Sequence, residues 1–225
     1  MGKGSSGAGG GVRDNTAWGG GGGAVERTED GYTMYRDDEA IEEHLRNEAW
    51  EGRLDEGQKE AIEAYANAHD VYKQINETLR MGKPADELTQ QRIENLSSAL
   101  DDSWLGENIV VTRRLGPEMF GGAQYPSEFR EMYGQTVTDE GFASSSAKVD
   151  FRAYANTRPI EAHIKVKGRQ KGVGAYINAF SEHTGPEYGE SEFLFNKKST
   201  FRILGSYYDA KGKTHVNLEY VGRGT

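Results

Sequence analysis

The feature that most constrains the fold of this 225-residue chain is a change in hydrophobic periodicity near Gly106. Before this residue, apolar side chains recur every three to four positions, as they do on one face of a helix. After it, short β-branched and aromatic runs alternate with turns rich in Gly, Pro and Asn, as in strands. The pattern predicts helices near 37–50, 55–81 and 86–104. It predicts strands near 108–112, 138–148, 160–166, 175–180, 192–196, 200–208 and 215–220. Helices first and strands afterwards indicate an α+β fold rather than an alternating parallel-sheet fold.

The N-terminus differs in composition from the rest of the chain. Eleven of the 30 glycines fall within residues 1–23, which is typical of a flexible tether. We therefore expect residues 1–30 to be a Gly-rich tail or linker, either natural or added to the protein, and residues 31–225 to form a single domain.

Composition excludes several classes of function. The chain has no cysteine, so thiol nucleophiles, disulfides and cysteine-bound zinc are excluded. Its five histidines form no H-x-x-x-H pair, so we expect no metal. No apolar run approaches the roughly 18 residues of a membrane span, so we expect no membrane partner. A net charge of -9 makes nucleic acid a less favoured partner. No secretory signal sequence is visible.

Two carboxylates follow a Gly/Pro-rich turn and begin a predicted strand. Because side chains alternate between faces in an extended chain, Glu190 and Glu192 point to the same side. A pair of acids at the mouth of a sheet suits chemistry at the anomeric carbon of a sugar, where one acid stabilises an oxocarbenium-like centre and the other assists the nucleophile. The alternative is a solvated strand end, since paired acids are common on exposed strands.

Two further motifs precede this pair in a fixed order. Arg113 closes the apolar strand 108–112, and Phe142 opens the small-residue run Phe-Ala-Ser-Ser-Ser that ends at Ser146. In that order the arginine, the Ser-x-Ser strand and the Glu-x-Glu turn resemble the three motifs of the mono-ADP-ribosyltransferases. The resemblance is greatest to the catalytic domain of the actin-modifying clostridial binary toxins and their insecticidal and phage-borne relatives.

The resemblance implies a set of residues that bind NAD. In the family, arginines hold the pyrophosphate, which suits the two parallel hydrogen bonds that a guanidinium offers to phosphate oxygens. Arg158 aligns by position with a further phosphate-contacting arginine, and Arg152 is its rival. The NAD-binding positions that the resemblance implies are Arg113, Arg114, Gly116, Phe142, Ser144, Ser146 and Arg158. Gly141 stands where relatives often carry a nicotinamide-binding asparagine.

The resemblance also implies the catalytic residues. Glu192 takes the position of the acid that stabilises the oxocarbenium-like state, and Ser144 takes that of the serine that orients it. Glu190 takes the position that varies with the acceptor, where glutamate accompanies arginine acceptors. Tyr188 takes the position of an aromatic residue that contacts the target protein.

The fold that the resemblance implies has N-terminal helices packed on a split mixed and antiparallel β-sandwich, with the NAD cleft between its sheets. The implied activity is transfer of ADP-ribose from NAD, as substrate, to arginine side chains of a host or target protein. Alternatives are a NAD glycohydrolase, or a non-catalytic docking module of a virion or toxin assembly. The expected site of action is the cytoplasm of a target or host cell, after delivery by a phage or a secretion system.

Overall fold

The computed structural model describes residues 23–149, 158–182 and 191–224. Six α-helices lie in these residues: α1 (Asp38–Leu45), α2 (Glu48–Glu51), α3 (Glu56–Asn67), α4 (His69–Met81), α5 (Glu87–Asp101) and α6 (Pro126–Phe129). The strands are β1 (Val25–Arg27), β2 (Thr33–Tyr35), β3 (Trp104–Leu105), β4 (Ile109–Leu115), β5 (Thr136–Asp139), β6 (Ala143–Ser146), β7 (Ile160–Val166), β8 (Gln170–Lys171), β9 (Gly174–Tyr176), β10 (Glu192–Phe195), β11 (Ser199–Tyr208) and β12 (Thr214–Arg223). Short 3₁₀ helices span Pro117–Phe120, Arg130–Met132 and Asn178–Phe180.

The main sheet has a five-stranded and a three-stranded part. Its strand order is β5-β11-β12-β7-β4-β6-β10-β9, and only the β12–β7 pair on this path is parallel. A single register pair, Thr112 with Ser146, joins β4 to β6, so the two parts are linked by a short stretch of pairing. β2 continues the sheet as a parallel neighbour of β4 and pairs with β1. Helices followed by a mixed sheet confirm the α+β prediction.

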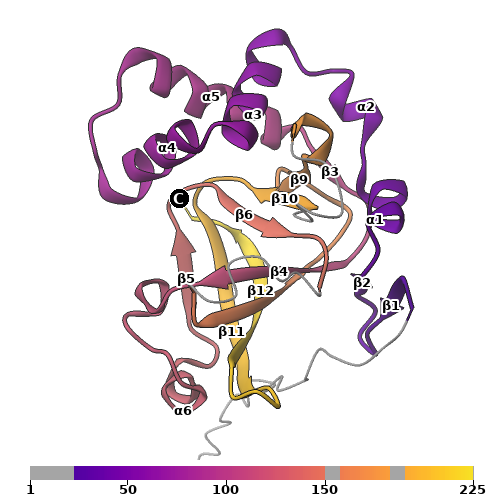
Figure 1. The fold of residues 1–225 in the computed structure, drawn as a ribbon, viewed down its shortest axis with the longest axis vertical. Coiled ribbons are helices and arrows are strands. Elements are labelled where there is room, and N and C mark those ends of the chain that lie inside the picture. The colour runs from indigo at the N-terminus through magenta and orange to yellow at the C-terminus, as the bar shows by residue number, and fades with distance from the viewer. Residues whose placement is uncertain (1–22, 150–157, 183–190, 225) are drawn as a thin grey trace, which may run out of the picture.

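The helices α3, α4 and α5 cover the three-stranded part, as Figure 1 shows at the top of the molecule. Their apolar residues, such as Ile62, Ile75 and Leu96, form one core with Leu194 of β10. Helix α3 begins with a capping pair: Asp55 accepts a hydrogen bond from the backbone N–H of Gln58 at 2.8 Å, and the Gln58 side-chain oxygen accepts one from the backbone N–H of Asp55.

The prediction of one helix over 55–81 is wrong, because the chain breaks at Ala68. Ala68 is extended (φ -113°, ψ 102°). The side chain of Asn67 reaches across to the 3₁₀ segment near the three-stranded part, where it donates to Phe180 O at 2.8 Å and accepts from Glu182 N at 2.6 Å. These long-range hydrogen bonds favour the break, and the local sequence pattern of a helix gives no sign of them.

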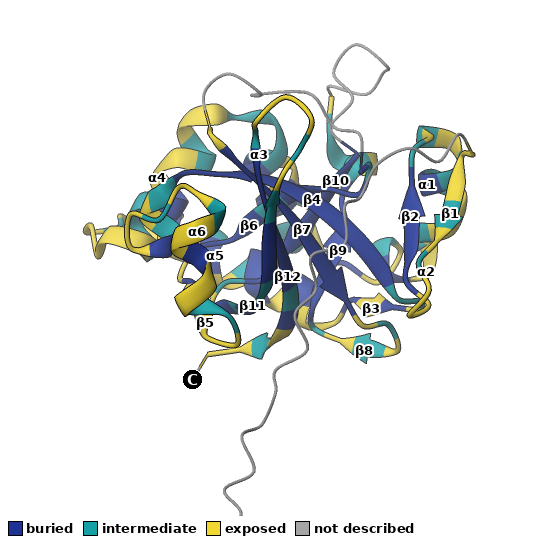
Figure 2. Cartoon of the chain, turned by 90° about the horizontal axis from the view of Figure 1, so that it is seen from below, coloured by how far each residue is buried: buried dark blue, intermediate teal, exposed yellow. Residues whose placement is uncertain are grey.

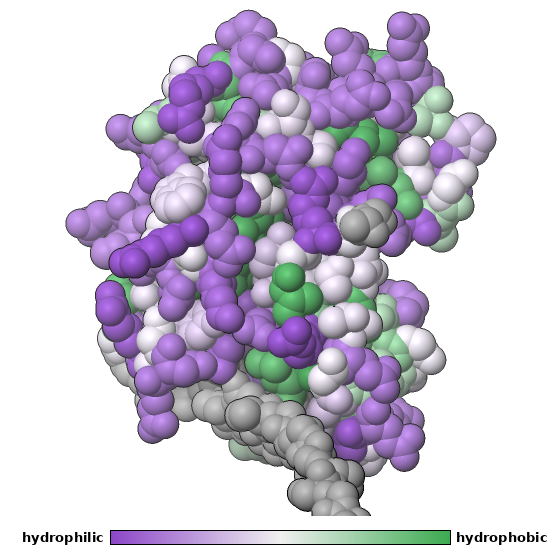
Figure 3. Space-filling model, turned by 180° about the vertical axis from the view of Figure 1, so that it is seen from behind, coloured by the Kyte–Doolittle hydropathy of each residue, from purple (hydrophilic) through white to green (hydrophobic). Residues whose placement is uncertain are grey.

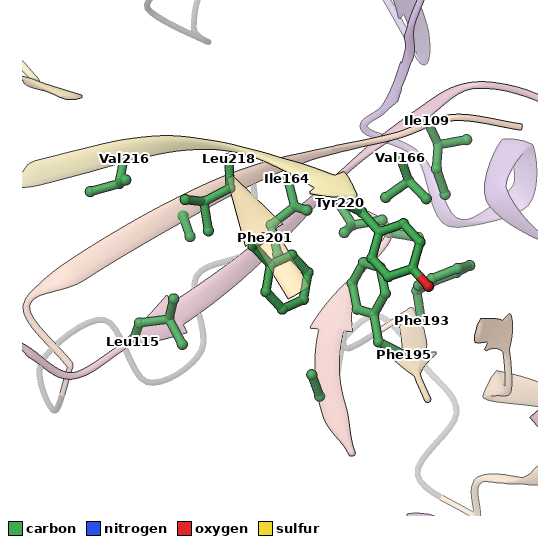
Figure 4. Packing of buried hydrophobic residues seen from close by; sticks show 14 of the residues in the cluster. Ile109, Leu115, Ile164, Val166, Phe193, Phe195, Phe201, Val216, Leu218 and Tyr220 are labelled. Carbon is green, nitrogen blue, oxygen red and sulfur yellow. The ribbon is translucent and has the colours of Figure 1, made fainter. Parts of the chain in front are cut away.

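A second core fills the space between the two parts of the main sheet. Phe193 and Phe195 of β10 point into it, away from the helices, and meet residues of β7, β11 and β12 (Figure 4). Phe195 packs edge-on against Phe201 with ring centres 5.3 Å apart and stacks on Tyr220. Because neighbours on β10 alternate, Leu194 and Glu192 face the helices instead. This core therefore fixes the direction of the Glu192 side chain.

Burial follows this layering. The central strands are buried along most of their length, whereas α6, the outer faces of the helices and the connecting loops carry exposed residues (Figure 2). Hydrophilic side chains cover most of the face seen in Figure 3, with only small hydrophobic areas between them. Among the described residues, no helix combines the length and apolarity that crossing a bilayer requires.

Two boundaries differ from the sequence predictions. Strand β1 begins at Val25, within the segment 1–30 predicted to be a tail, because its three residues pair with β2. Strand β4 continues to Leu115, so Arg113 and Arg114 lie inside a strand rather than after it. Pairing with β7 runs to the last residue of β4 and explains the extension.

Candidate active site

The strand that carries Glu192 is held directly beside the Ser-x-Ser strand. In the antiparallel pair of β10 and β6, Glu192 lies opposite Ser146 and Leu194 lies opposite Ser144. Directly opposed residues share a face of a sheet, so Glu192, Ser144 and Ser146 all face the helices. Glu192 is only 9% exposed. The register thus places a nearly buried carboxylate beside two hydroxyl side chains.

The residue before Glu192 has a constrained backbone. Ser191 adopts φ 38°, which is uncommon for a residue with a Cβ atom. Its hydroxyl donates to Asp38 Oδ1 of α1 at 2.6 Å, and Asp38 Oδ2 lies 2.8 Å from Lys148 Nζ. Its carbonyl accepts from the backbone of Ala147 at 2.9 Å. Helix α1 therefore ties the start of β10 to the end of β6.

The two arginines of β4 point to opposite faces. Arg113 Nη1 lies 2.8 Å from Asp139 Oδ2, and Arg114 Nη2 lies 2.6 Å from Glu161 Oε2. Both guanidinium groups are more than nine-tenths buried. Thr112, next to Arg113, is opposite Ser146, which is itself opposite Glu192. The structure therefore brings the three motifs onto three adjacent strands, β4, β6 and β10.

The other positions predicted from the sequence to bind NAD or the target lie in different surroundings. Arg158 donates from Nη1 to the backbone oxygen of Arg114 at 3.1 Å, so it lies at the same end of β4. Gly116 is buried at the end of β4, where a Cβ atom would lie 2.1 Å from the Glu118 carboxylate. The Phe142 ring is fully buried against Tyr65, with ring centres 5.8 Å apart. Arg152, Tyr188 and Glu190 lie outside the described residues.

Three helix residues also reach this site, and the sequence analysis did not identify them as site residues. Tyr65 of α3 donates to Phe142 O at 3.4 Å and accepts from Asn76 Nδ2 at 2.9 Å. Arg80 donates from Nη2 to Phe142 O at 2.9 Å and from Nε to Asp139 Oδ1 at 2.7 Å. Asn76 and Arg80 are four residues apart on α4, so helical spacing places both on one polar stripe. That spacing is the signal that could have found them.

Charges in this site are coupled. Burial raises the pKa of Tyr65 well above its usual range, and the nearby negative charge of Glu192 raises it further. Burial also acts to raise the pKa of Asp139, but Arg113 and Arg80 outweigh it and hold that pKa below its ordinary value. At neutral pH the site therefore holds an ionised Asp139 between two guanidinium groups and a neutral Tyr65 near Glu192.

Gly141 leaves room for the side chains of α4. A Cβ atom at this position would lie 2.3 Å from Asn76 Oδ1 and 2.8 Å from Arg80 Nε. The carboxamide of Asn76 therefore fills the space into which a side chain at position 141 would extend. Asn76 is 3% exposed, and its Oδ1 has no hydrogen-bond partner among the described residues. A carboxamide oxygen able to accept a hydrogen bond thus lies next to Phe142.

We expect Gly141→Ala to displace Asn76 and Arg80 and to lower the free energy of unfolding by about 1–3 kcal/mol, as overpacking does. Chemical denaturation measures this loss. Gly106→Ala is the matched control, because the nearest atom to its added Cβ, Trp104 Nε1, lies 4.0 Å away. Equal stability of the two variants would show that the space at Gly141 is not needed.

A surface hollow of about 590 Å³ lies elsewhere, at the β11–β12 hairpin. Its walls include Tyr125, Tyr208 and Lys213. Figure 1 places this hairpin at the far end of the molecule from α3, α4 and α5. None of the motif residues in the described ranges lines it. We therefore assign the candidate chemistry to β4, β6 and β10, where the titratable groups converge, and not to the hollow.

Comparison with solved structures supports the same fold. Plx2a, an ADP-ribosyltransferase toxin from Paenibacillus larvae, is 18% identical with a TM-score of 0.69, over 83% of this chain and 98% of that chain. The C3 exoenzyme from Clostridium limosum is 18% identical with a TM-score of 0.67, over 86% of this chain and 98% of that one. BECa, an ADP-ribosylating toxin of a C. perfringens binary enterotoxin solved with NADH, is 21% identical with a TM-score of 0.69, over 83% of this chain but 49% of that one. This chain thus spans about half the length of BECa.

Comparison at the level of sequence is more specific. No curated protein matches the chain. The family model described as ADP-ribosyltransferase exoenzyme matches residues 44–221, which include all three motifs. The chain therefore belongs to the ADP-ribosyltransferase exoenzyme family.

Proposed function

We propose that this protein transfers ADP-ribose from NAD to arginine side chains of a target protein and releases nicotinamide. The observation that carries the proposal is the register of three neighbouring strands, in which Thr112 opposes Ser146 and Ser146 opposes Glu192. This register brings the strand of Arg113, the strand of Ser144 and Ser146, and the strand of Glu192 side by side. Membership of the family and the NADH bound to BECa support NAD as the substrate.

The arginines suit the pyrophosphate of NAD. Arg113 and Arg114 are each paired with one carboxylate, which orients the guanidinium groups before a ligand arrives. A planar guanidinium carries five N–H donors in a fixed fork that matches the oxygens of a phosphate. Arg158 adds a third cation at the Arg114 end of β4. In this proposal the three arginines bind the dinucleotide, and Gly116, Phe142 and Ser146 line its site.

Glu192 suits the bond-breaking step. When the bond between nicotinamide and the ribose C1′ breaks, its electron pair leaves with nicotinamide and positive charge develops on the ribose. A preorganised carboxylate in a buried site stabilises that charge more strongly than it would in water. Ser144 lies two register pairs away, on the same face of the sheet, and orients Glu192 in this proposal.

Glu190 defines the acceptor in this proposal. An arginine side chain is protonated at neutral pH, so it needs an anion to orient it and to accept a proton. Its nitrogen then forms the new bond to C1′, and the proton passes to Glu190. Tyr188 contacts the target protein. Target proteins carrying an acceptor arginine in the cytoplasm of a host or target cell are the partners that this chemistry implies.

We expect Glu190→Gln to reduce transfer to arginine at least about 100-fold, the scale of a lost general base, and to retain part of the nicotinamide release. The experiment incubates the protein with labelled NAD and matched peptides that carry arginine, lysine or glutamine. It measures label on peptide and free nicotinamide separately.

The outcomes separate the alternatives. Label on the arginine peptide alone supports the proposal. Free ADP-ribose that forms at one rate with and without peptide or lysate protein would instead identify a NAD glycohydrolase. Binding of NAD without turnover would favour a docking module. Label on lysine or glutamine would overturn the arginine assignment but not the transferase activity.

A further inference from the structure

The face of the sheet that holds Arg114 also holds a cluster of three buried side chains, of which the proposed transfer uses only Glu161, the partner of Arg114. Glu161 and His163 are two residues apart on β7, so they share a face, and His215 of β12 is the register partner of Glu161. The three side chains are between 1% and 10% exposed. Strand pairing alone therefore brings two imidazoles and a carboxylate together.

The ligating atoms are close enough to bind one ion. His163 Nε2 lies 2.9 Å from His215 Nδ1. Glu161 Oε1 lies 3.4 Å from His163 Nε2 and 3.7 Å from His215 Nδ1. These three atoms form a triangle, and an ion at its centre would lie about 2 Å from each of them. That distance matches the bond lengths of zinc to imidazole and carboxylate.

The neighbours of the cluster orient these atoms. Asp209 Oδ2 lies 3.4 Å from His215 Nε2, so a proton on that nitrogen leaves Nδ1 with its lone pair toward the cluster. Arg114 and Lys213 contact Glu161 through the other carboxylate oxygen, Oε2, at 2.6 and 3.3 Å. Oε1 is thereby turned toward the two imidazoles. A carboxylate in this outer position is what holds an imidazole metal ligand in place.

We propose that Glu161, His163 and His215 form a binding site for a single zinc-type divalent transition-metal ion, with the fourth position open to water. Two imidazoles and one carboxylate favour zinc or cobalt(II) over the hard cations calcium and magnesium, which prefer oxygen ligands. The sequence hid this site, because its two histidines are 52 residues apart.

Protonation supports the same assignment. Burial lowers the pKa of His163 to about 3, with further effects from His215 and Arg114. Burial also lowers the pKa of His215, although Asp209 opposes this effect. Both imidazoles are therefore neutral near pH 7, as metal ligands must be. Without metal, the 2.9 Å separation suits a single N–H···N hydrogen bond, and tetrahedral binding requires the nitrogens to separate by a few tenths of an ångström.

The positive charges of Arg114 and Lys213 oppose a bound cation, which gives the site a distinctive test. Lys213→Ala removes one of these charges without removing a ligand, so it should tighten metal binding by at least about threefold. His163→Ala and His215→Ala remove a ligand and should each weaken binding at least about 100-fold. His44→Ala is the matched control. His44 is exposed and lies 3.8 Å from the Glu107 carboxylate, so this pair offers one imidazole and one carboxylate rather than two imidazoles and a carboxylate.

The experiment uses the full chain without a purification tag, after treatment with a chelator. Zinc is titrated in competition with a chromophoric chelator, and cobalt(II) is added to look for the visible bands of a tetrahedral site. We expect one equivalent of either metal and a higher unfolding temperature with zinc. Absence of stoichiometric binding by the folded wild-type chain would overturn the proposal, as would unchanged affinity in a folded His215→Ala variant. If the histidine variants do not fold, Lys213→Ala still tests the proposal. Zinc affinity that is unchanged or weaker in this variant would overturn it.

Discussion

Glu192→Gln is expected to lower the rate of ADP-ribose transfer by about 10² to 10³, the cost of removing one preorganised electrostatic contact in a transition state. Glutamine keeps the shape of the side chain on β10 but removes the charge that stabilises a cationic ribose. NAD binding should change much less than the turnover rate, because the charge on the ribose develops only as the bond to nicotinamide breaks. Single-turnover release of nicotinamide measures the effect without dependence on the acceptor.

The control for this variant is Glu140→Gln, which changes an exposed carboxylate that follows Asp139. Its rate should match that of the wild type. Both variants should unfold within about 1 kcal/mol of the wild type, which shows that lost activity is not lost folding. Transfer within threefold of the wild-type rate in Glu192→Gln would remove the central assignment.

Asp139→Asn is expected to lower the free energy of unfolding by about 3 kcal/mol, because it leaves buried guanidinium charge without its carboxylate. Asp139 is 5% exposed and contacts both Arg113 and Arg80. The loss should also free Arg113 from its fixed orientation and so weaken NAD binding. Urea denaturation followed by tryptophan fluorescence measures the first effect, and titration with NAD measures the second.

The pH dependence of this difference has a defined sign. The pKa of Asp139 is lowered in the folded protein, so its contribution to stability is fully present above its unfolded pKa of about 3.9 and is lost as pH falls through the folded value. The wild type and Asp139→Asn should therefore differ most near neutral pH and converge below about pH 4. Glu140→Gln, at an exposed position next to Asp139, is the control and should change stability by less than about 0.5 kcal/mol at any pH. A constant difference from pH 7 to pH 3 would show that the carboxylate charge is not what stabilises the fold.

Local patterns predicted most of the secondary structure because its causes are local. Alternation along β10 puts Glu192 and Leu194 on one face, and Leu194 packs on the helices. The Asp55 capping pair needs only a spacing of three residues. The break at Ala68 could not be predicted, since its visible cause is a contact between Asn67 and a segment more than 110 residues later.

The residues of the candidate site also fall into those that the sequence predicted and those that it could not. The motif residues Arg113, Ser144 and Glu192 could be chosen from the sequence because family resemblance preserves their order. The carboxylates that hold the arginines could not, because Asp139 on β5 and Glu161 on β7 meet β4 only through pairing between strands distant in sequence. Likewise, Asn76 belongs to the site only because Gly141 leaves space for it.

The sequence by itself determined the class of fold, the order of the three motifs and the alternation of side chains around Glu192, since periodicity and motif order are properties of the chain alone. Only the tertiary structure decided which charges pair, how α4 contributes to the site, and that His163 meets His215. Those outcomes depend on the register between strands distant in sequence, and register is set by the packing of a shared core.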